Sequence, residues 1–410
     1  MAKYLYILIL LFSFNNVKGN PKYEEIDRQS KNVPDSLKTS EEIAKYLTLK
    51  LKSEHEKVRA LHIWITHNIK YDLSLLNSDV TYTSYDKLVE ETINFGKGIC
   101  DNYSQLFHYM CNSIGIESYV ISGYTPEIDN NKIPDISHSW NAVKIEGDYL
   151  FLDNTWAAGY VNYKGNYIHK FIDEYFLISS KEFIKTHVPF DPIWQFLNNP
   201  ISNLDIENKD FTNLHDSGNF NYKDSISTMK TLDSITLIKK KIKRITQSGI
   251  TNKLIQKYVN ESKEQIENLT YDEWISTFND TNKRVNKAKD EINMGINFDN
   301  TFIGYMNKRF RNPKIEDTQI ENTIKNANLH FYQGKNELKK SMKILYRLEY
   351  SGKNKEKLKL TEKYKQELID FIIELEYKIL EVEPSIIKHT DYSKRYLKKW
   401  KLLRDFVPYD

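Results

Sequence analysis

The apolar residues of this chain recur every three or four positions over several stretches, a spacing that places them on one face of a helix. It predicts helices over residues 36–57, 58–72 and 101–114. Leu61 and Ile65 are two of the repeating positions in the second stretch. The first part of the chain is therefore expected to be helical.

The period then shortens to two, which is typical of strands. Four runs alternate or are rich in aromatic residues, and Gly, Pro and Asp separate them: GIESYVISGYT, HSWNAVKIE, DYLFLDNTW and EYFLISS. The second and third predict a hairpin, with a strand over His138 to Ile145, a turn at Glu146-Gly147-Asp148 and a strand over Tyr149 to Thr155. Helices followed by an antiparallel sheet predict an α+β domain over residues 20–200.

The periodicity disappears over residues 201–224, where polar turn residues dominate, and this segment is predicted to be a linker. Helical spacing returns beyond it, for example in the runs that begin at Leu232 and Leu368. Strict heptads are not sustained, which argues against a coiled-coil rod. Residues 225–410 are therefore predicted to form an all-α helical bundle or hairpin.

The first 19 residues have the pattern of a signal peptide: Lys3, an apolar run from Tyr4 to Phe14 and a cleavage site after Gly19. A buried first helix or a short anchor is the alternative, which the charged residues after Pro21 disfavour. No later segment approaches the ~20 apolar residues that cross a membrane. We expect a secreted or periplasmic protein without a membrane span.

Net charge gives no reason to expect a nucleic-acid partner, and the spacing of the two cysteines predicts that both are free thiols. The chain has 59 basic and 56 acidic residues and a net charge of +3, so nothing favours nucleic acid. Cys100 and Cys111 would lie roughly 16 Å apart on one helix. A disulfide needs Cα atoms within about 7 Å.

Cys100 stands at the start of a predicted helix, in the sequence GKGICDNY. The unpaired N–H groups and the positive end of the helix dipole at this position favour a thiolate, which is the nucleophilic form. Gly96 and Gly98 are expected to allow a sharp turn and to keep bulk away from the sulfur. A buried structural cysteine is the commoner explanation of a single Cys, so this position alone is weak evidence for a nucleophile.

His138 and Asp153 fall on the same face of the predicted hairpin, because positions paired across a two-residue loop sum to an odd number. A carboxylate beside an imidazole fixes its tautomer and stabilises its protonated form. A surface pair is the alternative. The chain has no CxxC or HxxxH spacing, and we expect neither a metal nor a cofactor.

The three motifs together resemble the transglutaminase-like superfamily of papain-fold cysteine enzymes. GICDNYSQLF is similar to its Cys motif, HSWNAVKI to its His motif and FLDNTWAAG to its Asp motif, in the same order and spacing. LHIWITHNIKYD resembles the helix that leads into the core. EYFLISSKEFIKTHVPFDPIWQFL resembles the tail of the bacterial and kyphoscoliosis-peptidase-like branch. The resemblance covers residues 40 to 198.

This resemblance implies a papain-like transglutaminase core followed by an all-α region. It also implies roles for three residues: Cys100 as nucleophile, His138 as general base and acid, and Asp153 as the orienting carboxylate. The Cys100 N–H would contribute to the oxyanion hole. The side-chain donor of that hole is not assigned by the motifs, and its candidates are Tyr82, Tyr85 and Asn94.

Four other aromatic residues are expected to have structural roles: Trp140 and Trp156 packed under the sheet, His108 on a helix face, and His187 in a loop that docks the tail. Asn102 begins a glycosylation sequon beside Cys100. A glycan there would obstruct the site, which favours a bacterial secretory route.

The leading functional hypothesis is an exported cysteine enzyme that acts on amide bonds of a peptide or protein substrate through an acyl-enzyme. Hydrolysis, as in a peptidase or amidase, is favoured over protein crosslinking because water needs no second pocket. The alternative is a non-catalytic scaffold or binding protein of the cell envelope. In either case the helical region is available to bind a protein or envelope partner.

Overall fold

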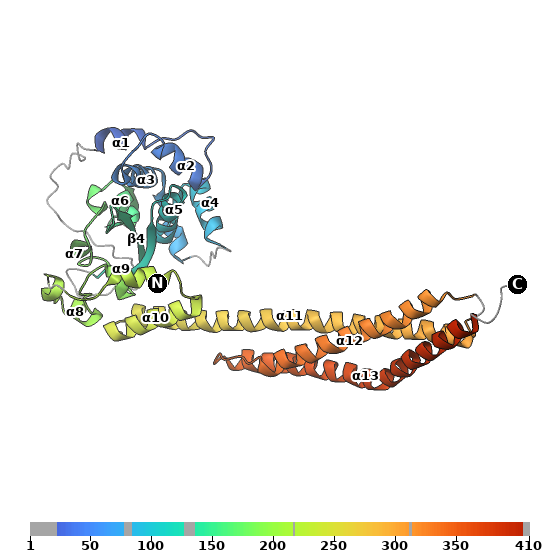
Figure 1. Ribbon diagram of the computed structural model, residues 1–410. Helices are drawn as coiled ribbons and strands as arrows, with labels where there is room; N and C mark the ends of the chain where they lie inside the picture. Colours follow the sequence, from blue (N-terminus) through green and yellow to red (C-terminus); the bar gives the residue numbers. More distant parts are fainter. Residues whose placement is uncertain (1–22, 78–83, 127–135, 216–217, 311–313, 405–410) are drawn as a thin grey trace. The chain divides into compact units, whose positions relative to one another are not determined.

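The computed structural model describes residues 23–77, 84–126, 136–215, 218–310 and 314–404 (Figure 1). The chain divides into two compact units, Met1–Ser262 and Lys263–Asp410. Within the described ranges, no helix is long and apolar enough to cross a membrane. The predicted signal peptide, residues 1–19, lies outside the described residues.

Five helices open the first unit: α1 (Glu24–Gln29), α2 (Ser40–Thr48), α3 (Glu54–Asn68), α4 (Tyr85–Phe95) and α5 (Cys100–Ser113). The single helix predicted over residues 36–57 is thus two helices. Thr39 and Ser53 each close a capping box with the glutamate three residues later, which starts α2 and α3 separately.

A four-stranded antiparallel sheet follows, in the order β5-β4-β3-β8. Its strands are β3 (Ser118–Tyr124), β4 (His138–Ile145), β5 (Asp148–Leu152) and β8 (Val188–Pro189). Glu146 and Gly147 connect β4 to β5 with φ of 52° and 91°, the left-handed pair that a two-residue hairpin loop requires. Two small pairs complete the strands: β1 (Lys70–Tyr71) with β2 (Lys97–Gly98), and β6 (Gly159–Val161) with β7 (Tyr167–His169).

Two of the predicted strands differ from the structure. The second hairpin strand ends at Leu152 because Asp153 accepts hydrogen bonds from two backbone N–H groups and caps α6 (Asn154–Ala158). This local bond overrides the alternating pattern. The run EYFLISS forms the short helix η3 (Asp173–Tyr175) and a single bridge between Ile178 and Phe151.

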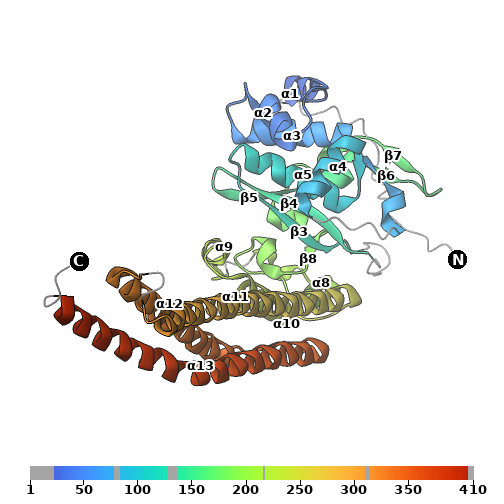
Figure 2. The same cartoon turned by 90° about the vertical axis from the view of Figure 1, so that its right-hand side faces the viewer.

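The sheet lies between two apolar layers. Helices α2, α3 and α5 cover one face, which β4 meets with Val143. The other face, which β4 meets with Trp140 and Ala142, is covered by three short elements: α7 (Ser180–Phe183), η4 (Pro192–Gln195) and α9 (Tyr222–Met229). Figure 2 shows α9 beside the sheet. Because side chains alternate along a strand, one strand serves both cores.

The remaining elements of the first unit are η2 (Leu73–Asn77), α8 (Asn203–Glu207), η5 (Thr212–His215), α10 (Ser234–Ser248) and the first part of α11 (Lys253–Asn307). Residues 201–224, predicted to be a linker, hold α8, η5 and the start of α9. Within this segment Ile201 and Ile206 are buried in a third apolar cluster together with Ile245 of α10 and Ile255 of α11.

The second unit is all-α. It contains the rest of α11, then α12 (Asp317–Arg347) and α13 (Lys355–Arg404), which continues through Pro384. Ile292, Phe331 and Ile372, one from each helix, are fully buried in its core. At Gly334 an added Cβ would lie 2.6 Å from the Ala288 carbonyl oxygen, so glycine allows α12 to approach α11 closely. The predicted α+β domain followed by an all-α region is confirmed.

Arg59 connects three elements of the first unit: its own helix α3, α1 and η3. Its side chain is 1% exposed, and its Nε and Nη2 donate to the two carboxylate oxygens of Asp27 at 2.7 and 2.6 Å. Its Nη1 donates to Asp173 of η3. Three rings surround the guanidinium: Tyr23, Phe171 and Phe176.

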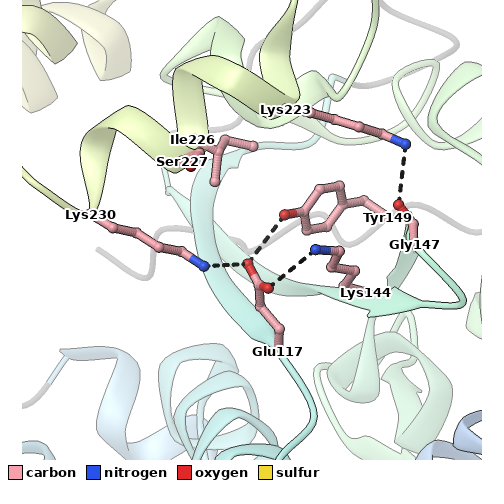
Figure 3. A pocket seen from close by; sticks show the side chains of 8 residues that line it. All are labelled: Glu117, Lys144, Gly147, Tyr149, Lys223, Ile226, Ser227 and Lys230. Atoms are coloured by element: carbon pink, nitrogen blue, oxygen red, sulfur yellow. Dashed lines mark hydrogen bonds and ion pairs between the residues drawn. The ribbon is translucent and has the colours of Figure 1, made fainter.

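A cavity of about 270 Å³ lies between the β3–β5 part of the sheet and α9. Figure 3 shows Glu117 pointing toward Lys230, which directly follows α9, and toward Lys144 and Tyr149 of the hairpin. The carboxylate accepts from Lys230 at 3.0 Å and from the hydroxyl groups of Tyr119 and Tyr149 at 2.5 and 3.2 Å. Glu117 therefore connects α9 to the sheet.

Replacing Glu117 by glutamine is expected to weaken the acid sensitivity of the fold. Burial acts to raise the pKa of Glu117, but Tyr119, Lys230 and Lys144 lower it from 4.5 to about 2. The stability it adds is present above pH 4.5 and is lost as the pH falls toward 2. When the pH is lowered from 6 to 3, the free energy of unfolding falls in both proteins. We expect the fall in Glu117→Gln to be smaller than that in the wild type by roughly 1–2 kcal/mol, after allowance for solvent screening.

Urea unfolding at the two pH values measures this difference. Lys230→Met, which removes only one partner of Glu117, is expected to reduce the acid sensitivity in part. A pH dependence in Glu117→Gln as steep as that of the wild type would contradict the prediction.

Candidate active site

Cys100 is the first residue of α5. Ile99 precedes it in an extended conformation and has no polar side-chain atom with which to cap the helix. Cys100 is partly exposed, while Cys111, on the same helix, is buried, and both are free thiols, as the helical spacing predicts. The fold thus presents one of the two sulfurs at the positive end of a helix.

The hairpin brings His138 and Asp153 into contact. His138 Nε2 lies 2.7 Å from Asp153 Oδ2, and the imidazole and carboxylate are 11% and 0% exposed. The observed register pairs Asn141 with Leu152, so paired positions sum to an odd number, as the predicted hairpin requires. The shared face and the two-residue loop explain why residues 15 positions apart meet.

Hydrogen bonds fix both the carboxylate and the backbone of Asp153. Its Oδ1 accepts from the backbone N–H groups of Thr155 at 2.8 Å and Trp156 at 3.1 Å, and its own N–H donates to the Tyr175 carbonyl at 3.0 Å. These bonds keep Oδ2 directed toward His138. The carboxylate therefore has little freedom to rotate.

The charges of the site favour a thiolate–imidazolium pair. Burial acts to raise the pKa of the Cys100 thiol, but a hydrogen bond from His138 and its charge lower the pKa below the ordinary value. Burial acts to lower the pKa of His138, but Asp153 and then Cys100 raise it to about 10. Because Nε2 of the imidazole faces Asp153, Nδ1 is the nitrogen left for the sulfur.

Ser139, the second residue of the His motif HSWNAVKI, also belongs to this site, although the sequence analysis gave it no role. Its hydroxyl and its backbone N–H both act to lower the pKa of the Cys100 thiol. Its hydroxyl also lies 3.1 Å from that of Ser104 on α5. Two donors beside a sulfur stabilise its anion.

His187 also belongs to this site, which differs from its predicted role of docking the tail. Its Nε2 lies 3.2 Å from Asp153 Oδ2. Gly123 of β3 is paired with both His138 and Pro189, so β8 brings the residue before it toward the β4–β5 hairpin. Because β8 has only two residues, no alternation in the sequence could have indicated this contact.

The remaining expectations have mixed outcomes. Trp140 is 1% exposed and packs under the sheet, as predicted. Trp156 is half-buried and stacks on His138, with ring centroids 5.7 Å apart. Gly98 does not make room for the sulfur, because an added Cβ would lie 2.4 Å from the Asn102 side chain.

The Asn102 amide is itself unavailable for modification in the folded chain. It is 2% exposed, and its Nδ2 donates to Thr92 Oγ1 at 2.8 Å while its Oδ1 accepts from the Ile99 N–H at 3.0 Å. These bonds link α4 to the first turn of α5. Asn102 therefore supports the position of Cys100.

The candidates for the side-chain oxyanion donor stay predictions. Tyr82 lies outside the described residues, and Tyr85 and Asn94 are exposed on α4. Tyr71 is a further tyrosine near the sulfur: it pairs with Gly98 in the parallel β1–β2 bridge. Its pKa is raised by burial and then by the charges of Cys100 and Asp153.

Among the described residues, one group has the spacing of a metal site: ligand atoms of His138, Asp153 and His187 lie within 4.8 Å of one another. However, both imidazoles direct Nε2 at the same carboxylate oxygen, at 2.7 and 3.2 Å. Each therefore donates a hydrogen bond to Asp153. We assign the three atoms to hydrogen bonding and not to metal ligation.

Comparison with known proteins agrees with this geometry. Residues 41–157 match the model of the Transglutaminase-like superfamily, and this range includes Cys100, His138 and Asp153. This chain carries a transglutaminase-like domain. The resemblance inferred from the three motifs is thereby confirmed.

The transglutaminase-like domain also has curated relatives. Kyphoscoliosis peptidase of Mus musculus is 29% identical over 194 residues, which cover 45% of this chain and 28% of that protein. Hillarin of Drosophila melanogaster is 27% identical over 210 residues, covering 46% of this chain and 25% of that protein. The chain thus spans about a quarter of the length of these relatives.

A solved structure, the crystal structure of a TGase, is similar at 18% identity and a TM-score of 0.23, and covers 34% of each chain. His187 lies beyond the residues that match the superfamily model, so its contact with Asp153 belongs to the part of the structure that follows the matched domain.

Proposed function

We propose that this protein is a thiol-dependent enzyme that cleaves amide bonds of peptides or proteins through an acyl-enzyme on Cys100. The observation that carries the proposal is the hydrogen bond between His138 and the buried carboxylate of Asp153, next to Cys100, whose thiol pKa His138 lowers. This is the order of groups that an activated thiol nucleophile requires. The match to the transglutaminase-like superfamily supports it.

The chemistry follows from these groups. The Cys100 thiolate attacks the carbonyl carbon, and the carbonyl oxygen becomes an oxyanion. The His138 imidazolium then gives its proton to the leaving amine as the C–N bond breaks, which leaves a thioester and a neutral imidazole. In the second step His138 takes a proton from water, the hydroxide attacks the thioester, and the acid product leaves with the thiol restored.

Water is the favoured acceptor because its attack needs no second binding site, whereas crosslinking requires a pocket for an amine. Some curated relatives are named peptidases, which is consistent with hydrolysis. The pattern of residues 1–19 supports export as part of the same proposal. The helical region is available to bind a protein or envelope partner.

The reactivity of Cys100 against pH tests the proposal without knowledge of the substrate. Iodoacetamide alkylates thiolates, so the midpoint of the labelling rate against pH gives the thiol pKa. In the wild type we expect this midpoint well below 9, the ordinary value of the group. In His138→Ala we expect it to rise, because the variant loses the cation that stabilises the thiolate.

Cys111 provides an internal control, since it is buried and burial raises its pKa. Mass spectrometry of the labelled peptides separates the two thiols. An ordinary midpoint for Cys100 that is unchanged by His138→Ala would favour the alternative, a transglutaminase-type fold used as a scaffold.

A further inference from the structure

His187 is a buried imidazole that the proposed reaction does not use. Its side chain is 0% exposed, and it stacks on Phe183 with ring centroids 4.0 Å apart. The rings of Trp140 and Trp156 lie 5.1 and 4.6 Å away. Within this aromatic cluster its two nitrogens have polar partners, so its position and its tautomer are both defined.

The tautomer follows from the partners. Nε2 lies 3.2 Å from the carboxylate oxygen of Asp153, which only accepts, so Nε2 carries the hydrogen. Nδ1 lies 2.8 Å from the Thr186 hydroxyl, which donates to it. Burial lowers the pKa of His187 to about 4, although Asp153 acts in the opposite direction. His187 is therefore neutral near pH 7.

The same carboxylate oxygen serves two imidazoles. Asp153 Oδ2 accepts from His138 at 2.7 Å and from His187 at 3.2 Å, while Oδ1 is occupied by two backbone donors. A second donor on Oδ2 draws electron density from that oxygen and weakens its pull on the proton of His138.

We propose that His187 is a positioning residue of the reaction, whose neutral imidazole shares Asp153 Oδ2 and so limits how firmly the carboxylate retains the proton of His138. The inference rests on the proposed function, because it concerns the acid that protonates the leaving amine. An imidazolium held too firmly by its carboxylate is a poor proton donor, so sharing the oxygen favours turnover.

The other titratable groups around Asp153 do not compete with this effect. They come from α3, β1, α5 and η3: His62, Tyr71, Tyr103 and Tyr175. Burial raises the pKa of the three tyrosines and lowers that of His62 to about 3, so all are neutral near pH 7. The charge that acts most strongly on Asp153 is that of His138.

Two substitutions separate the donor of His187 from its bulk. His187→Phe keeps a ring in the aromatic cluster and removes the hydrogen-bond donor. His187→Gln keeps an N–H group at about the position of Nε2. Thr186→Val removes the hydroxyl that holds the tautomer, and it provides a milder perturbation should the Phe variant fail to fold. Thermal unfolding of each purified full-length variant checks the fold.

NMR titration of the His138 imidazole gives the result. In His187→Phe the unshared carboxylate stabilises the imidazolium more, so the pH midpoint at which His138 loses its charge is expected to rise by about 0.5–1 pH unit. His187→Gln is expected to stay at the wild-type midpoint, and Thr186→Val to shift in the same direction as His187→Phe by less. Damage to the site would instead lower the midpoint toward the ordinary value of an imidazole.

A His138 midpoint in His187→Phe that equals or falls below that of the wild type would overturn the inference, as would equal shifts in the Phe and Gln variants. If the Phe variant does not fold, an unchanged or lowered midpoint in Thr186→Val has the same meaning. Iodoacetamide labelling of Cys100 in the wild type tests the proposed function: a low thiol midpoint, with no response of His138 to these substitutions, leaves that function standing and removes only the role of His187.

Discussion

Asp153→Asn is expected to reduce turnover of an ester such as p-nitrophenyl acetate by about 10³–10⁴-fold, which is the usual cost of losing the orienting carboxylate of such a triad. The amide oxygen can still accept from the backbone N–H groups that Oδ1 now serves. The amide NH₂ group, however, would face the N–H groups of His138 and His187, which forces a change of tautomer. The imidazolium of His138 also loses its counter-charge.

A comparison with Asp153→Ala separates catalysis from folding. The alanine variant loses the cap of α6 as well, and we expect it to be less stable than Asp153→Asn by about 0.5–2 kcal/mol. Urea unfolding measures the stability, and Cys100→Ala gives the background rate of ester hydrolysis. An asparagine variant that keeps more than a tenth of wild-type turnover would contradict the assigned role of Asp153.

Arg59→Met is expected to lower the free energy of unfolding by about 3–5 kcal/mol, the typical cost of removing one member of a buried ionic network. Methionine fills much of the volume but leaves the carboxylates of Asp27 and Asp173, 17% and 18% exposed, facing each other without a cation. The substitution should also disturb the candidate active site. Asp173 opens the short helix that also contains Tyr175, whose carbonyl accepts the hydrogen bond from the Asp153 N–H.

A matched control is available on the neighbouring helix. Arg28 pairs with Glu25, but both side chains are well exposed, at 72% and 58%, and such pairs contribute little. Arg28→Ala is therefore expected to leave the urea midpoint nearly unchanged. If the two arginine variants lose similar stability, the buried network around Arg59 does not have the importance assigned to it.

Parts of the site that depend on local geometry could be predicted from the sequence. The contact of His138 with Asp153 follows from the alternation of side chains and a two-residue loop, and neither requires long-range information. Free thiols at Cys100 and Cys111 follow from helical rise alone. The meeting of Cys100 with His138 depends on the packing of α5 on β4, and it was inferred only from the resemblance of three motifs.

Other features depend on contacts that leave no periodic trace. His187 reaches Asp153 because the two-residue strand β8 pairs across Gly123, and a strand so short has no alternation to detect. The early end of β5 has a different cause, since a side chain of the strand bonds to the backbone that follows it. Gly98 was assigned to the wrong neighbour because its close contact is with a side chain four residues later.

Asp153 has two tasks, since one oxygen starts a helix and the other holds an imidazole. If the proposed activity were lost in a descendant, Cys100 and Asp153 would therefore not be released from selection equally. Cys100, partly exposed at its helix end, is free to drift first, whereas loss of Asp153 would also unsettle the backbone after the hairpin. Inactive homologues are expected to retain the aspartate longer than the cysteine. The presence of the aspartate alone is therefore weak evidence that a homologue is an active enzyme.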